Sequence, residues 1–291
     1  MLSFENQKRL KFVITLGDGS FGDADRITLE GYRASINISN AGGLQMGQLS
    51  GNIYGMKVAD MDAITSYARY WGAFKPNTII VYAVDGKQES VVFSGNIVTA
   101  WADYQGMPDV FLNIQAQAAA LDLLKALPPT SIEGTVDVAN AMSRIAASMG
   151  YSLTNNGVSV TLENVYLANT GMEQAKELAR IANIELVVPP DESKRMVITP
   201  KGTAIGDVKP LVSAQTGMIG YPTYDGVTVI CRTLYNPAIH VYNLVKIETD
   251  VKRAQGEWLV LSIDHALDSE MPDGQWFSVF RAVNPVLYGN K

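Results

Sequence analysis

The chain has 291 residues, of which 47% are hydrophobic and 18% are charged, and its formal net charge is −6. This length allows two or three domains, and the low charge with a high apolar content excludes an intrinsically disordered chain. The negative net charge also disfavours tight nucleic-acid binding, which usually requires a basic face.

The cysteine and histidine content and the hydropathy pattern argue against a disulfide-bonded, metal-binding or membrane protein. Cys231 is the single cysteine, so an intramolecular disulfide is excluded, and two histidines leave little material for a metal site. No apolar run approaches the roughly 18 residues of a membrane span, and no secretory signal is visible near Met1. We therefore expect a chain that folds in a cytoplasm without stable membrane insertion.

The first part of the chain is predicted to be mainly β-strand, in a barrel or a strongly curved sheet. Asp85-Gly86 is typical of a tight hairpin turn, and Met107-Pro108-Asp109 marks a second one. Strand-like runs cover Arg9–Leu16, Ile27–Ser39, Leu44–Tyr54, Thr78–Val84, Val91–Ala102 and Val110–Gln117. One helix is predicted from apolar residues at three- and four-residue spacing, namely Val58, Met61, Ile64, Ala68 and Trp71.

After Ala118 the pattern changes to that of a small α+β unit. One helix is predicted to open at Thr135 and to stop at Gly150, and a second to start near Thr170. The second helix runs into a strand at Ile184–Val188. Two further short strands are predicted at Val158–Leu162 and Arg195–Ile198.

From Val208 onward the pattern is β again. The clearest strands are Gly226–Arg232, Leu244–Thr249, Trp258–Leu267 and Gln275–Val283. Met271-Pro272-Asp273-Gly274 turns the last hairpin and repeats the Met-Pro-Asp tripeptide of the first β region. The fold class is therefore mainly β with an α+β insert: residues 1–117 and 202–291 are two β-barrel-like domains that flank residues 118–201. An internal duplication of the β regions is left open.

One glycine- and aspartate-rich segment, Gly17–Asp25, is a candidate for binding calcium or phosphate. Its order does not match the spacing of a calcium loop, and no closing glutamate follows at the twelfth position. The glycines do not precede a helix, as a phosphate loop would require. A surface turn between two strands is the preferred interpretation.

Asp264-His265 could be half of a catalytic pair, and Cys231 could be a nucleophile. Adjacent residues on a strand point to opposite faces, so Asp264 and His265 cannot pair as a triad requires. No Gly-x-Ser-x-Gly nucleophile motif accompanies them or His240. Cys231 lies in an alternating apolar strand, where cysteine behaves as a small hydrophobic residue, and Arg232 points to the other face.

The remaining candidates are acidic pairs and tryptophans. Asp60 and Asp62 lie at a helix start, and Asp191 and Glu192 lie in a loop, so helix-dipole complementation and solvation explain them. The tryptophans could stack on sugars, but core and interface packing are commoner uses; they are Trp71, Trp101, Trp258 and Trp276. No catalytic, cofactor-binding or metal-binding residue is assigned, and the chain is predicted not to be an enzyme.

The C-terminal third resembles a known family. The segments Ser213–Pro222, Asp225–Val229 and Leu234–Ile239 resemble the baseplate hub proteins of contractile-tailed bacteriophages. So do Gly256–Trp258, Asp264-His265, Asp268–Glu270 and Gly274–Trp276, and Val92–Ile97 resembles a strand that such hubs place before a long hairpin. One departure is Asn243, where hubs usually carry a glycine, although asparagine tolerates the left-handed conformation.

The resemblance implies a fold similar to the base of the type VI secretion spike. It implies a homotrimer in which each chain gives two β-barrel-like tube domains to a pseudo-six-fold ring. Such a ring would join the hexameric tail tube to a trimeric spike and line the DNA ejection channel of the virion baseplate, without cofactors. Two alternatives stay open: a distal-tail or adaptor protein that binds receptor-recognition proteins or host sugars, and, third, a peptidoglycan hydrolase.

Overall fold

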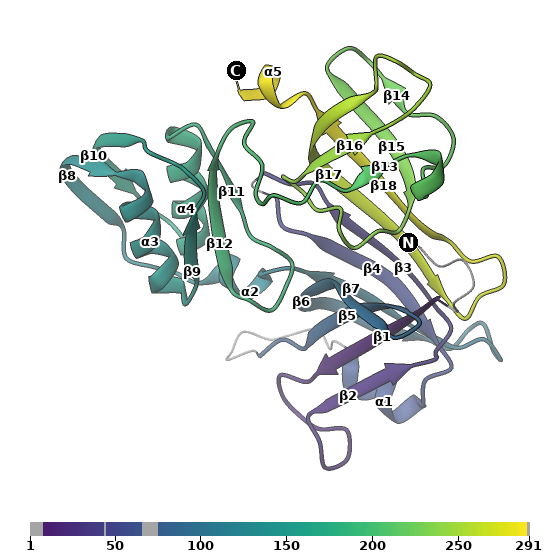
Figure 1. The fold of residues 1–291 in the computed structure, drawn as a ribbon. Coiled ribbons are helices and arrows are strands. Elements are labelled where there is room, and N and C mark those ends of the chain that lie inside the picture. Colours follow the sequence, from purple (N-terminus) through teal and green to yellow (C-terminus); the bar gives the residue numbers. More distant parts are fainter. Residues whose placement is uncertain (1–7, 44, 66–74, 290–291) are drawn as a thin grey trace.

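The computed structural model of the chain describes residues 8–43, 45–65 and 75–289, and β-strands dominate it (Figure 1). Its largest sheet has 13 strands, in the order β14-β15-β18-β17-β3-β4-β7-β6-β5-β1-β2, with β16 attached to β17 and β13 to β16. The strands of the first β region are β1 (Lys8–Thr15), β2 (Arg26–Glu30), β3 (Ala34–Asn40), β4 (Gln48–Tyr54), β5 (Thr78–Asp85), β6 (Gln88–Asp103) and β7 (Phe111–Gln117). Those of the last region are β13 (Leu211–Val212), β14 (Thr223–Tyr224), β15 (Thr228–Leu234), β16 (Leu244–Ile247), β17 (Gly256–Ser269) and β18 (Trp276–Val283).

A single strand pairing joins the two β regions. The second half of β17 pairs antiparallel with β3, from Ile263 opposite Asn40 to Ser269 opposite Ala34. The first half of β17 pairs with β16, and a register shift between Val260 and Ser262 separates the halves in the pairing with β18. The shift is a β-bulge, which bends a strand and lets it serve two parts of a fold. The two β regions therefore form one continuous sheet.

Alternation along β3 was predicted from its period of two and is confirmed. Ile36 and Ile38 are each 2% exposed, whereas Asn37 and Ser39 are exposed on the other face. The prediction of one strand over Ile27–Ser39 was wrong, because the chain turns at Gly31, where φ is +74°. Glycine adopts this left-handed conformation without steric cost, so the run divides into β2 and β3.

The three predicted hairpin turns lie where expected. Asp85 and Gln88 close the turn between β5 and β6, and residues 104–110 connect β6 to β7. The Met271–Gly274 turn connects β17 to β18, and both Met-Pro-Asp tips project to the same side of the molecule (Figure 1). In each hairpin a long strand with a register shift precedes a shorter strand, so the two β regions share an architecture.

The buried residues form two hydrophobic cores. One core combines the first β region with the α+β unit and with Trp276 and two neighbours of the last β region, and it includes Phe12 and Phe93; the other lies wholly in the last β region around Trp258 and Phe280. Phe93 and Phe280 are both 0% exposed. Burial of each such side chain contributes about 2–3 kcal/mol. The division into 1–117, 118–201 and 202–291 stays a prediction, and the first core crosses both of its boundaries.

The α+β unit packs two helices, α3 (Val138–Met149) and α4 (Gly171–Ile181), near the sheet β11-β12-β9. The helix predicted from Thr135 begins later, because the Asp137 carboxylate caps it by accepting from the Asn140 backbone N–H at 2.9 Å. The residues before it form a strand that the pattern did not predict, and the strand predicted at Val158–Leu162 begins and ends later. The unit's strands are β8 (Thr130–Asp137), β9 (Ser152–Asn155), β10 (Thr161–Leu167), β11 (Ile184–Val187) and β12 (Arg195–Pro200).

The remaining helical segments are short. The helix α1 (Val58–Ile64) buries Met61 and Ile64 and ends at Thr65, whose backbone is no longer helical. Of the residues that predicted a longer helix, Ala68 and Trp71 lie outside the described part of the chain, as does Leu44. The others are α2 (Ala120–Leu124), α5 (Pro285–Gly289) and the 3-10 turn η1 (Ala214–Thr216). Among the described residues, no helix has the length and apolar content that a bilayer crossing requires.

Candidate functional site

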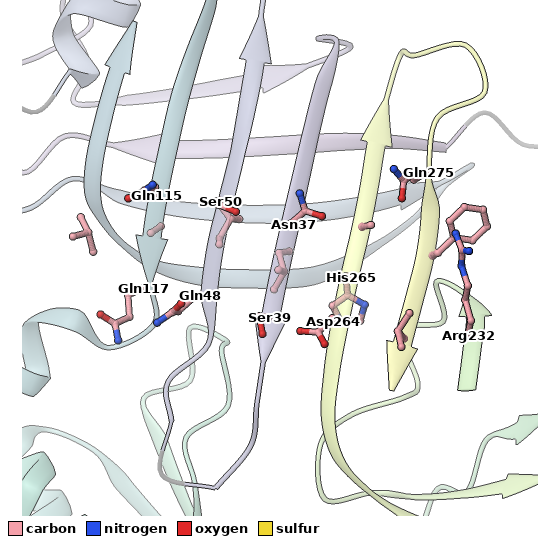
Figure 2. Close-up of a pocket in the computed structure, with 17 residues that line it drawn as sticks. Asn37, Ser39, Gln48, Ser50, Gln115, Gln117, Arg232, Asp264, His265 and Gln275 are labelled. Carbon is pink, nitrogen blue, oxygen red and sulfur yellow. The ribbon is translucent and has the colours of Figure 1, made fainter. Parts of the chain in front are cut away.

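One face of the large sheet is hollowed and polar. The hollow has a volume of about 590 Å³ and is lined by residues of β3, β4, β6, β7, β15, β17 and β18. Figure 2 shows its polar side chains side by side across the strands. They are Asn37, Ser39, Gln48, Ser50, Gln115, Gln117, Arg232, Asp264 and Gln275; His265, whose side chain belongs to the opposite face of β17, also borders the hollow.

The register of the sheet orders the uncharged side chains into rows. Residues opposite one another on neighbouring strands point to the same face, so each row crosses β3, β4 and β7. The rows are Ser35–Asn52–Asn113, Asn37–Ser50–Gln115 and Ser39–Gln48–Gln117. Amides and hydroxyls both donate and accept hydrogen bonds, and none of them carries charge at neutral pH. We call these nine residues the polar rows.

Charged residues lie at the border of the polar rows, on the C-terminal strands. Asp264 and Asp268 of β17 are opposite Ser39 and Ser35 and extend two of the rows. The Arg232 guanidinium on β15 lies 4.4 Å from the centre of the Phe277 ring, within the range of a cation–π contact. The face therefore combines a neutral centre with a border of mixed charge.

The polar rows exist because the opposite faces of the same strands are apolar. Ile38, Leu49 and Ile114 alternate with them and are at most 3% exposed, so they anchor the register against the first core. A slip by one residue would exchange the two faces. Sequence analysis did not single out the rows, although the alternating serines, asparagines and glutamines of 35–39, 48–52 and 113–117 carried the signal.

The side chains of Asp264 and His265 lie on opposite faces of β17, as predicted from their adjacency. Asp264 is exposed on the polar face, whereas His265 Nδ1 lies 2.8 Å from Ser278 Oγ within the sheet interior. Burial, with a smaller effect of His240, lowers the pKa of His265 to about 4. The Tyr235 ring contacts it edge-on at 5.3 Å, and its hydroxyl lies 3.1 Å from Ser90 Oγ. The imidazole is thus neutral at pH 7 and is held by packing and one hydroxyl.

Cys231 and His240 do not meet at a reactive site. Cys231 is 1% exposed in the second core, and burial raises the pKa of its thiol to about 12. The thiolate that a nucleophile needs is therefore scarce at neutral pH. His240 lies in the loop between β15 and β16, where burial lowers its pKa and Asp191 opposes that shift.

The segment Gly17–Asp25 forms the predicted surface turn. It connects β1 to β2, and the Leu16 N–H donates to the Asp25 carbonyl at 2.8 Å. Phe21 and Ala24 form an isolated bridge across the turn. Within residues 8–43, 45–65 and 75–289, no three histidine, cysteine or acidic side chains gather as a metal site would require.

The acidic pairs and the tryptophans are dispersed. Asp60 lies in the first turn of α1, Asp62 accepts from the Tyr104 hydroxyl at 3.4 Å, and the Asp191 carboxylate accepts from the Ser193 N–H, near Glu192. Trp258 and Trp276 are 5% and 7% exposed and belong to different cores, while Trp101 is 42% exposed. Trp71 lies outside the described residues. The structure does not bring them together as a stacking platform.

Solved structures define the class of fold. A tail protein from Neisseria meningitidis MC58 superposes with a TM-score of 0.66 at 9% identity, over 97% of this chain and 98% of that one. A 43 kDa tail protein of prophage MuSo2 from Shewanella oneidensis gives 0.58 at 14% identity, over 95% and 98%. An E. coli component of the type VI secretion system, described as similar to the T4 tail proteins gp27 and gp5, gives 0.57 at 8%, over 86% and 73%. The fold is that of phage tail and type VI secretion proteins.

A match to a family model identifies the family of the chain. Residues 9–277 match the family described as baseplate hub gp41, and the chain belongs to that family. A search of curated proteins found no significant match. The resemblance to baseplate hubs, expected from Ser213–Pro222 and the segments after it, is confirmed, and the protein is a structural component of a phage tail.

Proposed function

We propose that the chain is the hub of a contractile-tail baseplate, in which three copies form a ring with pseudo-six-fold symmetry. The ring joins the hexameric tail tube to a trimeric spike, lines the channel through which DNA leaves, and assembles in the host cytoplasm. Family membership and the presence of two hairpin-bearing β regions in one chain support this assignment. It is a mechanical role without catalysis or cofactor.

The observation that carries the channel proposal is the uncharged character of the polar rows. Each Lys or Arg that neutralises a phosphate releases counterions and adds sequence-independent affinity, which would retard a moving duplex. Amides and hydroxyls in the rows offer only hydrogen bonds that water also makes. In the trimer the face of Figure 2 points to the lumen, and a formal charge of −6 per chain agrees with a surface that does not retain DNA.

The curvature of the first β region supports a barrel-like tube domain. β1 pairs with β5 and also approaches β17, since the Leu10 N–H donates to Ser269 Oγ at 3.1 Å. The sheet thus curls until its N-terminal and C-terminal parts meet again. Its terminal strands, β2 and β14, keep one edge without a strand partner among the described residues. In the ring, neighbouring chains cover these edges.

The ring is expected to withstand salt, because strand edges and apolar patches hold it and not exposed ion pairs. Raising the salt from about 0.1 M to about 1 M shortens the Debye length from about 10 Å to about 3 Å and screens surface charges. Sedimentation velocity should find the same trimer at both concentrations. Dissociation into single chains at high salt would contradict the proposed interface.

The alternative role is that of a distal-tail or adaptor protein that binds receptor-recognition proteins or host sugars. The observation favouring it is the hollow itself, where Gln275, Asp264 and the Phe277 ring could bind sugar hydroxyls and a sugar face. Titration with cell-surface oligosaccharides would detect it. The third hypothesis is a peptidoglycan hydrolase. It requires that the protein degrade purified cell wall and that substitution of His265 abolish this activity.

A further inference from the structure

A buried carboxylate in the α+β unit binds two tyrosines from the last β region. Glu185 of β11 is 7% exposed, and its Oε2 accepts from the Tyr242 hydroxyl at 2.7 Å. Its Oε1 accepts from the Tyr288 hydroxyl of α5 at 2.6 Å. Burial and the neighbouring carboxylate raise the pKa of both tyrosines, so both hydroxyls keep the protons that they donate.

The contact extends to the first β region. The Tyr242 hydroxyl also accepts from the Gly43 N–H at 3.0 Å, in the loop between β3 and β4. One carboxylate and two hydroxyls therefore connect residues of all three parts of the chain, which lie 57, 103 and 199 positions apart in sequence along the three hydrogen bonds. Every oxygen of the group has a partner, which buried polar groups require.

Tyr242 is held in an unusual backbone conformation. Its φ is +62°, which non-glycine residues adopt only at an energetic cost. Two hydrogen bonds fix it there: its N–H donates to the Val260 carbonyl at 2.7 Å, and its carbonyl accepts from the Ile205 N–H at 2.8 Å. Such strain persists where the surroundings over-determine the conformation. The side chain is thereby directed at Glu185 and Gly43 together.

The helix α5 is short and exposed, and this contact ties it to the α+β unit. It has five residues, none of them buried, and helices this short are not stable alone. Val286 and Leu287 are 69% and 50% exposed, so their apolar surface does not anchor it. Tyr288 reaches the second core and Glu185, and the chain beside α5 carries Gly202, where a Cβ would lie 2.4 Å from the Pro285 carbonyl oxygen.

We propose that Glu185, Tyr242 and Tyr288 form a latch that locks the α+β unit, residues 42–43 after β3, and α5 into one rigid block. The latch fixes the α+β unit relative to the large sheet, and opening it frees α5 and residues 42–43 at the same time. A merely local contact would loosen only the segment that carries the altered residue. This inference stands whether or not the chain forms the proposed trimer.

Hydrogen exchange on the full chain tests the latch. Glu185→Ala leaves the Tyr242 and Tyr288 hydroxyls without their carboxylate acceptor, and we expect amide exchange to rise about tenfold together in residues 184–187, 42–43 and 286–289. Glu185→Gln preserves the shape and one oxygen acceptor, so its rise should be smaller. Tyr166→Phe removes a hydroxyl from a 65% exposed tyrosine of the same unit and should change none of these segments.

The conservative variants Tyr242→Phe and Tyr288→Phe remove only a hydroxyl each, so we expect them to keep the fold. They distinguish a latch from a merely local contact. In a latch, Tyr288→Phe accelerates exchange at 42–43 as well as in α5, although Gly43 does not touch Tyr288. Acceleration confined to α5, unchanged exchange in Glu185→Ala, or an equal rise throughout the central strands would each overturn the proposal. In the double variant the rise in exchange should be smaller than the sum of the two single effects, because both tyrosines bind the same carboxylate.

Discussion

A trimer of the chain carrying Ser39→Lys, Ser50→Lys and Gln115→Lys is expected to bind duplex DNA, whereas the unaltered trimer does not. Each substituted side chain is exposed in the polar rows, so the change adds three positive charges per chain to the proposed channel wall. At about 0.05 M salt we expect binding at least about tenfold tighter than that of the unaltered trimer, with a steep decline as salt is added. Fluorescence anisotropy of a labelled duplex measures it.

A matched variant separates position from net charge. Ser131→Lys, Thr135→Lys and Ser159→Lys add the same charge at exposed positions of the α+β unit. Charges that converge on a channel act on one duplex together, so the polar-row variant should bind more tightly than this control. Equal affinity of the two variants would contradict a channel wall. Micromolar, salt-sensitive binding by the unaltered trimer would contradict the whole argument.

Stability should fall in mild acid because of His265. Its pKa of about 4 in the folded chain lies below the 6.5 of an unperturbed histidine, so folding favours the neutral ring. The contribution of His265 to the free energy of unfolding is fully present above pH 6.5 and is lost as the pH falls from 6.5 toward 4. Between about pH 7.5 and about pH 4.5 the loss attributable to this group is about 2 kcal/mol.

Urea unfolding of the unaltered chain and of His265→Gln at several pH values isolates the pH-dependent contribution of His265. Glutamine can still hydrogen-bond to Ser278 but does not titrate, so the variant should lose about 2 kcal/mol less over the interval than the unaltered chain. The comparison removes the contribution of carboxylates, which both chains share. Parallel pH profiles would show that folding does not change the pKa of His265, and would contradict this prediction.

Local patterns predicted much of the fold. Alternation located β3, β15 and β18, and cap residues located the ends of α3 and α4 within a few positions. The pairing of β17 with β3 was not predictable, because a period of two states that a strand has two faces and not which strand lies beside it. Short polar strands such as β8 were missed for a related reason: much of β8 is exposed, so it has little apolar alternation.

The site was less accessible to sequence reasoning than the fold. Serine, asparagine and glutamine are common on any exposed strand, so Asn37, Ser50 and Gln115 become a row only through the register of three strands. The latch depends on contacts still further apart, since Glu185 and Gly43 are brought together by the packing of separate units. The dispersal of Trp101, Trp258 and Trp276 is likewise a property of the two cores.

Molar mass in solution tests the central claim most directly. Light scattering of the purified chain, alone and mixed with the spike protein of the same tail, should give a particle of three times 31.6 kDa, about 95 kDa, either at once or as part of the complex with the spike. Such a mass is what a three-fold hub requires. A mass of 31.6 kDa in both samples, with no complex formed, would contradict the account.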